Sequence, residues 1–456
     1  MYLCRKTEIV RILFICLLLV CSSSFAQYSI KGTIDPDLNY SWILLYKLEN
    51  GNQTYMDNAD VVEGEFEFKI DEKEPSGVYR AYYQIENNLY VEFLYNKEKV
   101  AFSFNPNNPE ESIQFTESEE NNLTHNYYSL IRYHQKKIDS LQVLFFKSTE
   151  ETEDQKISKE YQDELSVLKE KQVEFELASK GKLANHFIRA SGNYNAEKPF
   201  KEPEAYINYI KDHFFDSIDP KDTVLSHSSF VNDRLNDYVF YLNQADNIES
   251  KNSLQQEAIG KAVKWINDDY AILKSFEESL IQEYLAEENT VMIYHVMDKY
   301  YNVLPPDYQN EELKNRVLGT LKTAVGTIAP DFNWEQEGIK TSLHQLNGTD
   351  YYIVLFFSAD CPHCQIEIPE FYNFISGIEN IKVIAVGLED AKENWELMTG
   401  EYHEFINILD LDKWSSTKVK DYGVTAIPSY FVLDAKKTIL AKPEDFNELR
   451  SMFETK

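Results

Sequence analysis

The chain has 456 residues, enough for about two to four domains with buried cores. Its hydrophobic content of 43% and aromatic content of 14% exclude a wholly disordered chain. The formal net charge of −31 at pH 7 argues against nucleic acid or an anionic membrane surface as a partner.

Residues 1–26 have the pattern of a secretory signal peptide. Basic residues open the segment, an apolar stretch runs from Ile12 to Cys21, and Ser24-Phe25-Ala26 supplies a cleavage pattern. A lipoprotein signal with Cys21 as the lipidated residue is the less favoured alternative, because the bulky Val20 precedes that cysteine. The stretch is too short to span a bilayer, for which about 20 residues are needed. We therefore expect an exported protein of the periplasm or cell envelope, without a transmembrane segment after cleavage.

Residues 27–116 are predicted to form a β-rich domain. Runs of β-forming residues such as Trp42 to Tyr46 and Val100 to Phe104 are separated by turn pairs such as Asn105-Pro106. Several short strands at this spacing predict an all-β, sandwich-like domain. The many tyrosines are interpreted as sheet packing, and a ligand surface is the other interpretation.

Residues 117–324 are predicted to be α-helical. Apolar residues recur every three or four positions from Leu123 to Phe145 and from Ile157 to Phe175, which predicts two long helices in a hairpin. Further helices are expected near residues 203–216, 229–244, 253–287, 289–302 and 308–324.

Residues 325–456 are predicted to form an α/β domain. Strands are expected at 351–357, 381–388, 405–409, 429–434 and 438–441, with helices from Cys361, near Trp395, around Trp414 to Tyr422 and from Pro443. Alternating strands and helices with a late hairpin predict a sheet covered by helices on both faces.

Cys361 and Cys364 form a C-x-x-C pair where the strand 351–357 meets the next helix. The free N–H groups and the dipole of a helix start favour a thiolate on Cys361, as thiol–disulfide exchange requires. Zinc sites use the same spacing. The other three cysteines lie in the predicted signal peptide, so no second pair remains to complete a zinc site or a disulfide framework. The pair is therefore interpreted as redox-active rather than metal-binding.

The two cysteines are expected to have different roles. Cys361 comes first and is the predicted nucleophile, whereas Cys364 lies one helical turn further and suits resolution of a mixed disulfide. His363 lies between them, where a cationic imidazole would stabilise the thiolate; the alternative is a solvent-exposed spacer.

Two more features belong to the predicted site. Glu367 is three residues past Cys364, close to the same helical face, where its carboxylate could relay protons to the resolving thiol; alone it would be interpreted as a surface acid. The Ile427-Pro428 bond precedes the strand 429–434 and is a candidate cis peptide. A cis Pro428 would expose the backbone of Ile427 to pair with an incoming peptide.

At these residues the region 325–456 resembles the thioredoxin-fold, TlpA/ResA-like thiol–disulfide oxidoreductases of the bacterial cell envelope. The positions that carry the resemblance are Gly326, Ala329-Pro330-Asp331-Phe332, Cys361-Pro362-His363-Cys364, Glu367, Pro369 and Ile427-Pro428-Ser429. More loosely, residues 28–116 resemble the β-rich domain of unknown function that precedes such modules. The resemblance implies disulfide exchange with protein thiols and disulfides, without a metal or an organic cofactor.

Some residues depart from the pattern of this family. Asp360 stands where the family usually has tryptophan, and Leu355 occupies the position of the buried aspartate of thioredoxin. Pro362-His363 resembles the dipeptide of oxidising, DsbA-type proteins, whereas Ile427 and Glu367 resemble the reducing branch. The direction of electron flow therefore stays open, with reduction slightly favoured over oxidation or isomerisation.

We therefore expect an exported thiol–disulfide oxidoreductase that exchanges electrons with a donor or acceptor in the membrane. The alternative is an envelope binding or assembly protein, in which the β and helical regions hold the partner and the thioredoxin-like domain is an accessory. The acidic, tyrosine-rich first half of the chain motivates this alternative.

Overall fold

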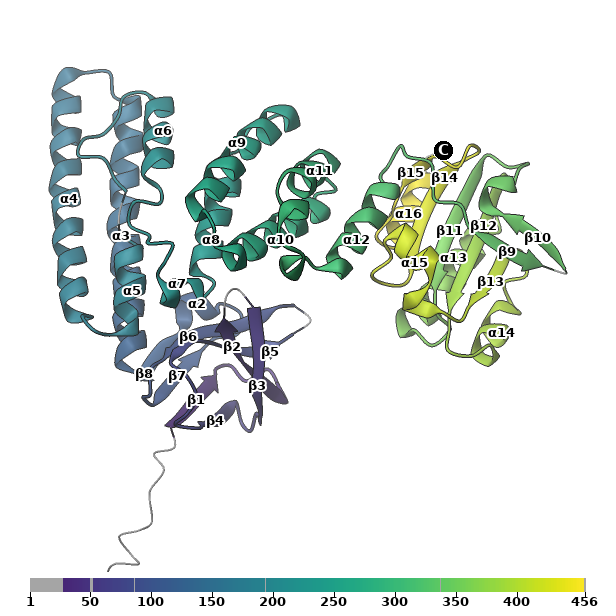
Figure 1. Ribbon diagram of the computed structural model, residues 1–456, viewed down its shortest axis with the longest axis horizontal. Coiled ribbons are helices and arrows are strands. Elements are labelled where there is room, and N and C mark those ends of the chain that lie inside the picture. Colours follow the sequence, from purple (N-terminus) through teal and green to yellow (C-terminus); the bar gives the residue numbers. More distant parts are fainter. Residues whose placement is uncertain (1–27, 50–51, 86, 193, 337, 455–456) are drawn as a thin grey trace, which may run out of the picture. The chain divides into compact units, whose positions relative to one another are not determined.

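The structure, a computed structural model, describes residues 28–49, 52–85, 87–192, 194–336 and 338–454 (Figure 1). The predicted signal peptide, with Cys4, Cys16 and Cys21, lies outside the described residues. The chain divides into two compact units, with the boundary between Phe276 and Glu277 in helix α10 (Tyr270–Ala286). The first unit holds the β-rich region and most of the helices, and the second holds the C-terminal α/β domain.

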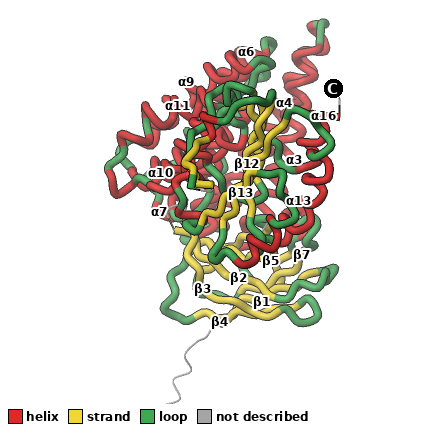
Figure 2. Tube along the Cα trace, turned by 90° about the vertical axis from the view of Figure 1, so that its right-hand side faces the viewer, coloured by secondary structure: helices red, strands yellow, loops and turns green. Residues whose placement is uncertain are grey.

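The first unit begins with two four-stranded sheets. Their strands are β1 (Tyr28–Ile34), β2 (Trp42–Glu49), β3 (Asn52–Asp60), β4 (Glu65–Ile70), β5 (Gly77–Gln84), β6 (Leu89–Tyr95), β7 (Val100–Phe104) and β8 (Gln114–Glu117). The strand orders are β4-β1-β7-β8 and β3-β2-β5-β6, and the short α2 (Pro109–Ser112) lies between β7 and β8 in sequence. Alternate residues, such as Phe66 and Phe68 of β4, enter one core between the sheets, which lie against each other in Figure 2. The predicted sandwich-like β domain is confirmed.

Two long helices follow, α3 (Glu119–Lys147) and α4 (Glu151–Ala178), and they run side by side (Figure 1). Helix α3 begins where the side chain of Ser118 accepts a hydrogen bond from the amide of Asn121. Ile138, Leu141 and Leu165 belong to the buried cluster between the two helices. The predicted helical hairpin is confirmed.

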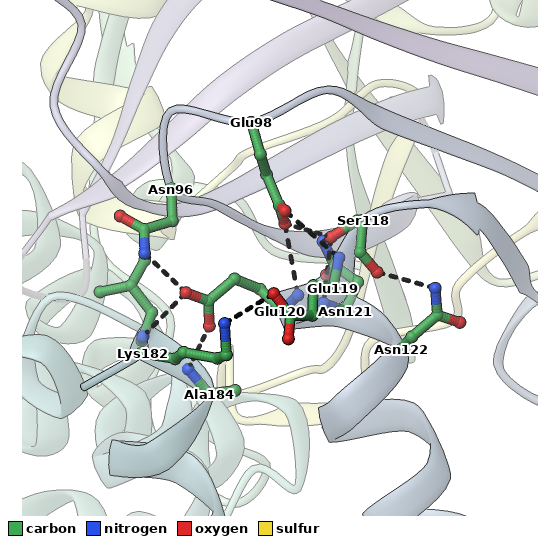
Figure 3. Close-up of polar contacts among 10 residues, drawn as sticks. Asn96, Glu98, Ser118, Glu119, Glu120, Asn121, Asn122, Lys182 and Ala184 are labelled. Carbon is green, nitrogen blue, oxygen red and sulfur yellow. Dashed lines mark hydrogen bonds and ion pairs between the residues drawn. The ribbon is translucent and has the colours of Figure 1, made fainter. Parts of the chain in front are cut away.

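A polar cluster joins the sandwich to these helices (Figure 3). The Glu98 carboxylate accepts hydrogen bonds from the Ser118 hydroxyl at 2.5 Å and from the first amides of α3. Glu120 is 3% exposed, and its carboxylate accepts from Asn96 Nδ2 at 2.6 Å and from the amide of Ala184 at 2.7 Å. The buried carboxylate of Glu120 thus connects α3 with the loop after β6 and with the helical segment at Ala184. The relative position of these three segments is therefore fixed by hydrogen bonds as well as by apolar packing.

The remaining helices of the central region are α5 (Leu183–Ala190), α6 (Pro203–His213), α7 (Thr223–Ser226), α8 (Phe230–Asn236), the π-helical η1 (Asp237–Tyr241), α9 (Ile248–Ile266), α10, α11 (Thr290–Lys299) and α12 (Glu311–Lys322). The single helix predicted near 253–287 is wrong, because α9 ends at Ile266 and α10 begins at Tyr270. Asn267 adopts a left-handed φ of 62°, and the Asp269 carboxylate accepts from the amides of Ala271 and Ile272, each at 3.1 Å.

The α/β domain of the second unit contains a five-stranded sheet of order β13-β12-β11-β14-β15 and a two-stranded hairpin, β9 with β10. The 3-10 turns η2 (Tyr301–Val303) and η3 (Pro306–Tyr308) still belong to the helical region, because they lie between α11 and α12. The elements of the α/β domain are β9 (Asn333–Gln336), β10 (Ile339–Ser342), η4 (Leu343–Gln345), β11 (Tyr351–Phe357), α13 (Pro362–Ile375), β12 (Ile381–Leu388), α14 (Glu393–Thr399), β13 (Ile406–Asp410), η5 (Lys413–Ser415), α15 (Thr417–Tyr422), β14 (Ser429–Asp434), β15 (Ile439–Ala441) and α16 (Phe446–Glu454). Strand β11 pairs in parallel with β12 and antiparallel with β14.

Strand β11 is central and buried on both faces, which explains its unbroken run of apolar residues. Ile353, Leu355 and Phe357 pack with residues of α13 and α16, such as Phe371 and Phe446. The alternate residues of β11 pack on the other face with Val419 and Tyr422 of α15. The predicted α/β domain is confirmed, and the first cysteine of the motif lies four residues past the end of the central strand.

Among the described residues, no helix combines the length and apolar character needed to cross a membrane.

Candidate active site

Cys361 and Cys364 lie at the amino end of α13, beyond the carboxyl end of β11. Cys361 has extended backbone angles and immediately precedes the helix, and Pro362 occupies its first position, where a missing N–H removes no helical bond. Both cysteines are free thiols; Cys361 is partly exposed, whereas Cys364 is 0% exposed. The local fold therefore presents one sulfur to solvent and keeps the second behind it.

The loop before β14 lies directly beside the exposed sulfur. The Ile427–Pro428 peptide bond is cis, as expected. The Cys361 thiol donates to the carbonyl oxygen of Ile427, with a sulfur–oxygen distance of 3.7 Å. Residues 66 positions apart in sequence are thus in contact.

Burial raises the pKa of the Cys364 thiol well above its usual value. A hydrogen bond from the backbone of Ser358 opposes this rise, while Cys361 and the carboxylate of Glu367 add to it. Cys364 is therefore a thiol at neutral pH and needs a proton acceptor before it can attack a mixed disulfide.

Glu367 is half-buried on α13, and its Oε1 atom holds two neighbouring elements. It accepts a hydrogen bond from the Tyr430 hydroxyl of β14 at 2.8 Å and from the amide of Phe446, the first residue of α16, at 3.0 Å. The charge of Glu367 is close enough to raise the pKa values of Cys364 and Tyr430. The predicted proton relay thus lies near the resolving thiol while also fixing the position of α16.

The remaining predicted residue, His363, is exposed on the first turn of α13. Asp360 is also exposed and accepts a hydrogen bond from Asn394 Nδ2 of α14 at 2.7 Å. The residue just before Cys361 therefore places an acidic side chain on the surface beside the motif.

Glu389 is a site residue that the sequence interpretation missed. Its carboxyl is 1% exposed, accepts from the Ser358 hydroxyl at 3.0 Å and from the amide of Ala359 at 2.6 Å, and thereby holds the loop that leads to Cys361. Burial raises the pKa of Glu389. No motif marks it in the sequence, because its role depends on the pairing of β12 with β11, which places the residue after β12 at the same sheet edge as the cysteines.

The described residues contain no group of three or more histidine, cysteine, aspartate or glutamate side chains placed to hold a metal ion.

Two family models match separate parts of the chain. Residues 324–452 match the model described as Redoxin, and residues 28–124 match a domain of unknown function, DUF4369. None of the curated proteins with which the chain was compared matches it. The resemblance inferred from the sequence is confirmed: the C-terminal domain is a thioredoxin-like oxidoreductase domain, preceded by a domain of unknown function.

Several solved structures are similar to parts of the chain. A thioredoxin-like protein from Bacteroides caccae is 23% identical over 56% of this chain and 94% of its own, with a TM-score of 0.40. The thioredoxin domain of a thiol-disulfide oxidoreductase from Bacteroides vulgatus is 22% identical over 29% of this chain and 96% of its own, with a TM-score of 0.26. A domain of a possible thiol-disulfide isomerase from Cytophaga hutchinsonii is 26% identical over 29% of this chain and 91% of its own, also with a TM-score of 0.26.

Proposed function

We propose that the protein exchanges disulfides with protein substrates through Cys361 and Cys364. One observation carries the proposal: a partly exposed sulfur at a helix start touches the Ile427 carbonyl, and a second, fully buried sulfur lies one helical turn behind it. This arrangement supplies a nucleophile, a resolving thiol and a backbone surface for the substrate.

The reducing reaction has two steps. The Cys361 thiolate attacks one sulfur of a substrate disulfide; the substrate S–S bond breaks, a mixed disulfide forms, and one substrate thiolate leaves. Cys364 then loses its proton and attacks Cys361 Sγ, which releases the second substrate thiolate and leaves the Cys361–Cys364 disulfide. The substrate gains two electrons and the pair of cysteines loses two, so a donor must reduce the pair for another cycle.

The other residues have supporting roles in this scheme. The Ile427 backbone, held by the cis peptide to Pro428, pairs with the substrate chain next to its disulfide. Glu367 accepts the proton of Cys364, which burial otherwise retains on sulfur. His363, exposed beside Cys361, stabilises the thiolate when it carries a proton.

The proposal places the reaction in the cell envelope, with reduction favoured over oxidation and with a membrane protein as the electron donor. It rests on the signal-like residues 1–26 and on the residues Glu367 and Ile427 that resemble the reducing branch. The reduction potential of the pair tests the direction: a value near the roughly −270 mV of thioredoxin supports reduction, and one near the roughly −120 mV of DsbA contradicts it.

Turnover of insulin disulfides tests the chemistry. We expect Cys361→Ser to abolish insulin reduction, because the attacking sulfur is lost. We expect Cys364→Ser to accumulate mixed disulfides with substrate, visible on non-reducing gels and removed by dithiothreitol. Full activity of Cys361→Ser, or a Cys364→Ser variant that captures nothing, contradicts the proposed mechanism.

A further inference from the structure

A groove in the first unit runs along strand β6, far from the dithiol in sequence. Its volume is about 800 Å³, within the range of pockets that hold ligands. Residues of β6, of helix α3 and of the start of α8 line it, among them Tyr90, Glu92, Tyr128, Ser129 and Asp233. We call this hollow the β6 groove.

Strand β6 is the edge strand of its sheet, and its free edge faces this groove. The sheet order β3-β2-β5-β6 leaves β6 paired with β5 alone. At Leu94 the free edge is already occupied: its amide donates to Asn121 Oδ1 at 2.7 Å, and its carbonyl accepts from Asn121 Nδ2 at 2.7 Å. A side-chain amide of α3 therefore pairs with the backbone of β6 as a neighbouring strand would.

The pairing at Leu94 also fixes which way the preceding backbone groups point. In an antiparallel ladder, alternate residues direct both N–H and C=O to the same side of the strand. The register with β5 is unbroken from Leu94 through Glu92 to Tyr90. The N–H and C=O groups of Glu92 and Tyr90 therefore point away from β5, and both residues line the β6 groove.

The charges around the groove indicate what kind of chain fits it. The lining includes four carboxylates, Glu92, Glu110, Glu111 and Asp233, against the guanidinium of Arg132 and the imidazole of His125. Arg80 forms an ion pair with Glu92 at 2.9 Å, yet desolvation still raises the pKa values of Glu92 and Asp233. The lining therefore carries more carboxylates than cationic groups, which favours a basic side chain in the groove.

We propose that the β6 groove binds an extended segment of unfolded polypeptide that carries a basic side chain, added as a further strand along β6. Backbone hydrogen bonds at Tyr90 and Glu92 supply affinity without demanding one sequence, as strand addition does elsewhere. The ring of Tyr128 supplies apolar contact. The inference rests on the proposed function in one respect: it takes the bound polypeptide to be a substrate of the Cys361–Cys364 pair. The binding itself does not require either cysteine.

Binding of a defined peptide to the full chain tests the proposal. The probe is a fluorescein-labelled, cysteine-free peptide of about eight residues, the length of an ordinary strand, with alternating valine and threonine and two lysines. We expect saturable binding by fluorescence anisotropy, together with slower deuterium exchange of the amides of Tyr90 and Glu92, which point away from β5. We expect the affinity to fall by roughly tenfold or more when alternate peptide nitrogens are methylated, because methylation removes the hydrogen-bond donors of the added strand. We expect a similar fall when both lysines are replaced by glutamates. Equal binding of the methylated peptide, or no binding of the parent peptide at millimolar concentration, overturns the proposal.

A matched pair of variants locates the binding. Ser129 and Asn126 are both exposed on α3, but Ser129 lines the groove and Asn126 is not among its lining residues. Ser129→Trp should fill the groove and abolish peptide binding, and Asn126→Trp should leave it unchanged. Unchanged binding by Ser129→Trp overturns the assignment. Insulin reduction by the unchanged chain separates the two proposals. If the chain binds the peptide but does not reduce insulin, the dithiol mechanism alone is contradicted. If it reduces insulin but does not bind the peptide, the groove proposal alone is contradicted.

Discussion

Two glutamates lie close to the cysteines of the candidate site, and their surroundings differ. Glu389 is buried beneath the loop that precedes Cys361, where its carboxyl accepts from Ser358 and Ala359. Glu367 is half-buried beside Cys364 and connects α13 to β14 and α16. We propose that the first glutamate positions the nucleophile and that the second acts on the proton of the resolving thiol.

Replacement of Glu389 tests the positioning role. Glu389→Ala leaves the Ala359 amide and the Ser358 hydroxyl without their buried acceptor, which costs about 1–3 kcal/mol of unfolding free energy. We expect slower alkylation of Cys361 as well, because its loop loses its anchor. Glu389→Gln keeps an acceptor oxygen and should restore most of both properties. Urea unfolding and iodoacetamide kinetics measure them, and an alanine variant with native stability and native Cys361 reactivity contradicts the role.

Replacement of Glu367 tests the electrostatic coupling to Cys364. The negative carboxylate disfavours the thiolate and so raises the pKa of Cys364; the neutral Glu367→Gln side chain should lower it. In a Cys361→Ser background, where Cys364 is the remaining described thiol, the pH profile of alkylation should move to lower pH. Glu370→Gln, an exposed acid on the same helix, is the control and should leave the profile in place. A profile that does not move with Glu367→Gln shows that the two groups are not coupled.

At the scale of elements, the predictable parts are those whose signal is local. Strand β11 was predicted with its observed bounds because a strand buried on both faces needs an unbroken apolar run. The β9–β10 hairpin was missed because its four-residue strands mix polar and apolar residues. The break between α9 and α10 was missed because the apolar period continues past Asn267, while the break depends on its left-handed backbone and on the cap at Asp269.

The contact between α12 and α15 gives a prediction at this scale. A Cβ atom on Gly319 would lie 2.4 Å from the Cα of Gly423 and 2.7 Å from the carbonyl oxygen of Lys420. Both are backbone atoms, so the helices must separate, and we expect Gly319→Ala to lower the unfolding free energy by roughly 1–3 kcal/mol. Gly377→Ala is the matched control, because its nearest neighbour is a carbonyl oxygen at an ordinary 3.5 Å. Equal unfolding free energies of the two variants in urea would show that α12 and α15 can move apart at little cost.

For the whole molecule, the order of an all-β region, a helical region and an α/β domain followed from changes of hydrophobic period along the chain. The C-x-x-C motif, Glu367 and Ile427-Pro428 were recognisable because each has a sequence pattern. Glu389 and the β6 groove have none: the first depends on which strands pair, and the second on how α3 lies along the edge of β6. Both features depend on tertiary contacts between segments that are distant in sequence, and the sequence alone therefore could not predict them.

Glu277 links the stability of the molecule to pH. The residue is 1% exposed, its Oε2 atom has no hydrogen-bond partner among the described residues, and burial raises its pKa to about 8. The folded state therefore keeps a proton that the unfolded chain, with an ordinary glutamate pKa, has lost. Stability is greatest below the unfolded pKa and falls as pH rises toward the folded pKa, by roughly 1.4 kcal/mol per pH unit between about pH 5 and 8.

Replacing Glu277 by glutamine removes this dependence, because the amide does not ionise. The unfolding free energy of Glu277→Gln, measured in urea at several pH values, should match the wild type near pH 5 and exceed it increasingly toward pH 8. Glu283→Gln, at an exposed position of the same helix, should follow the wild type throughout. If the difference in unfolding free energy between Glu277→Gln and the wild type does not change with pH, Glu277 is ionised in the folded protein. Its carboxylate is then hydrated, and the proposed dependence on pH is contradicted.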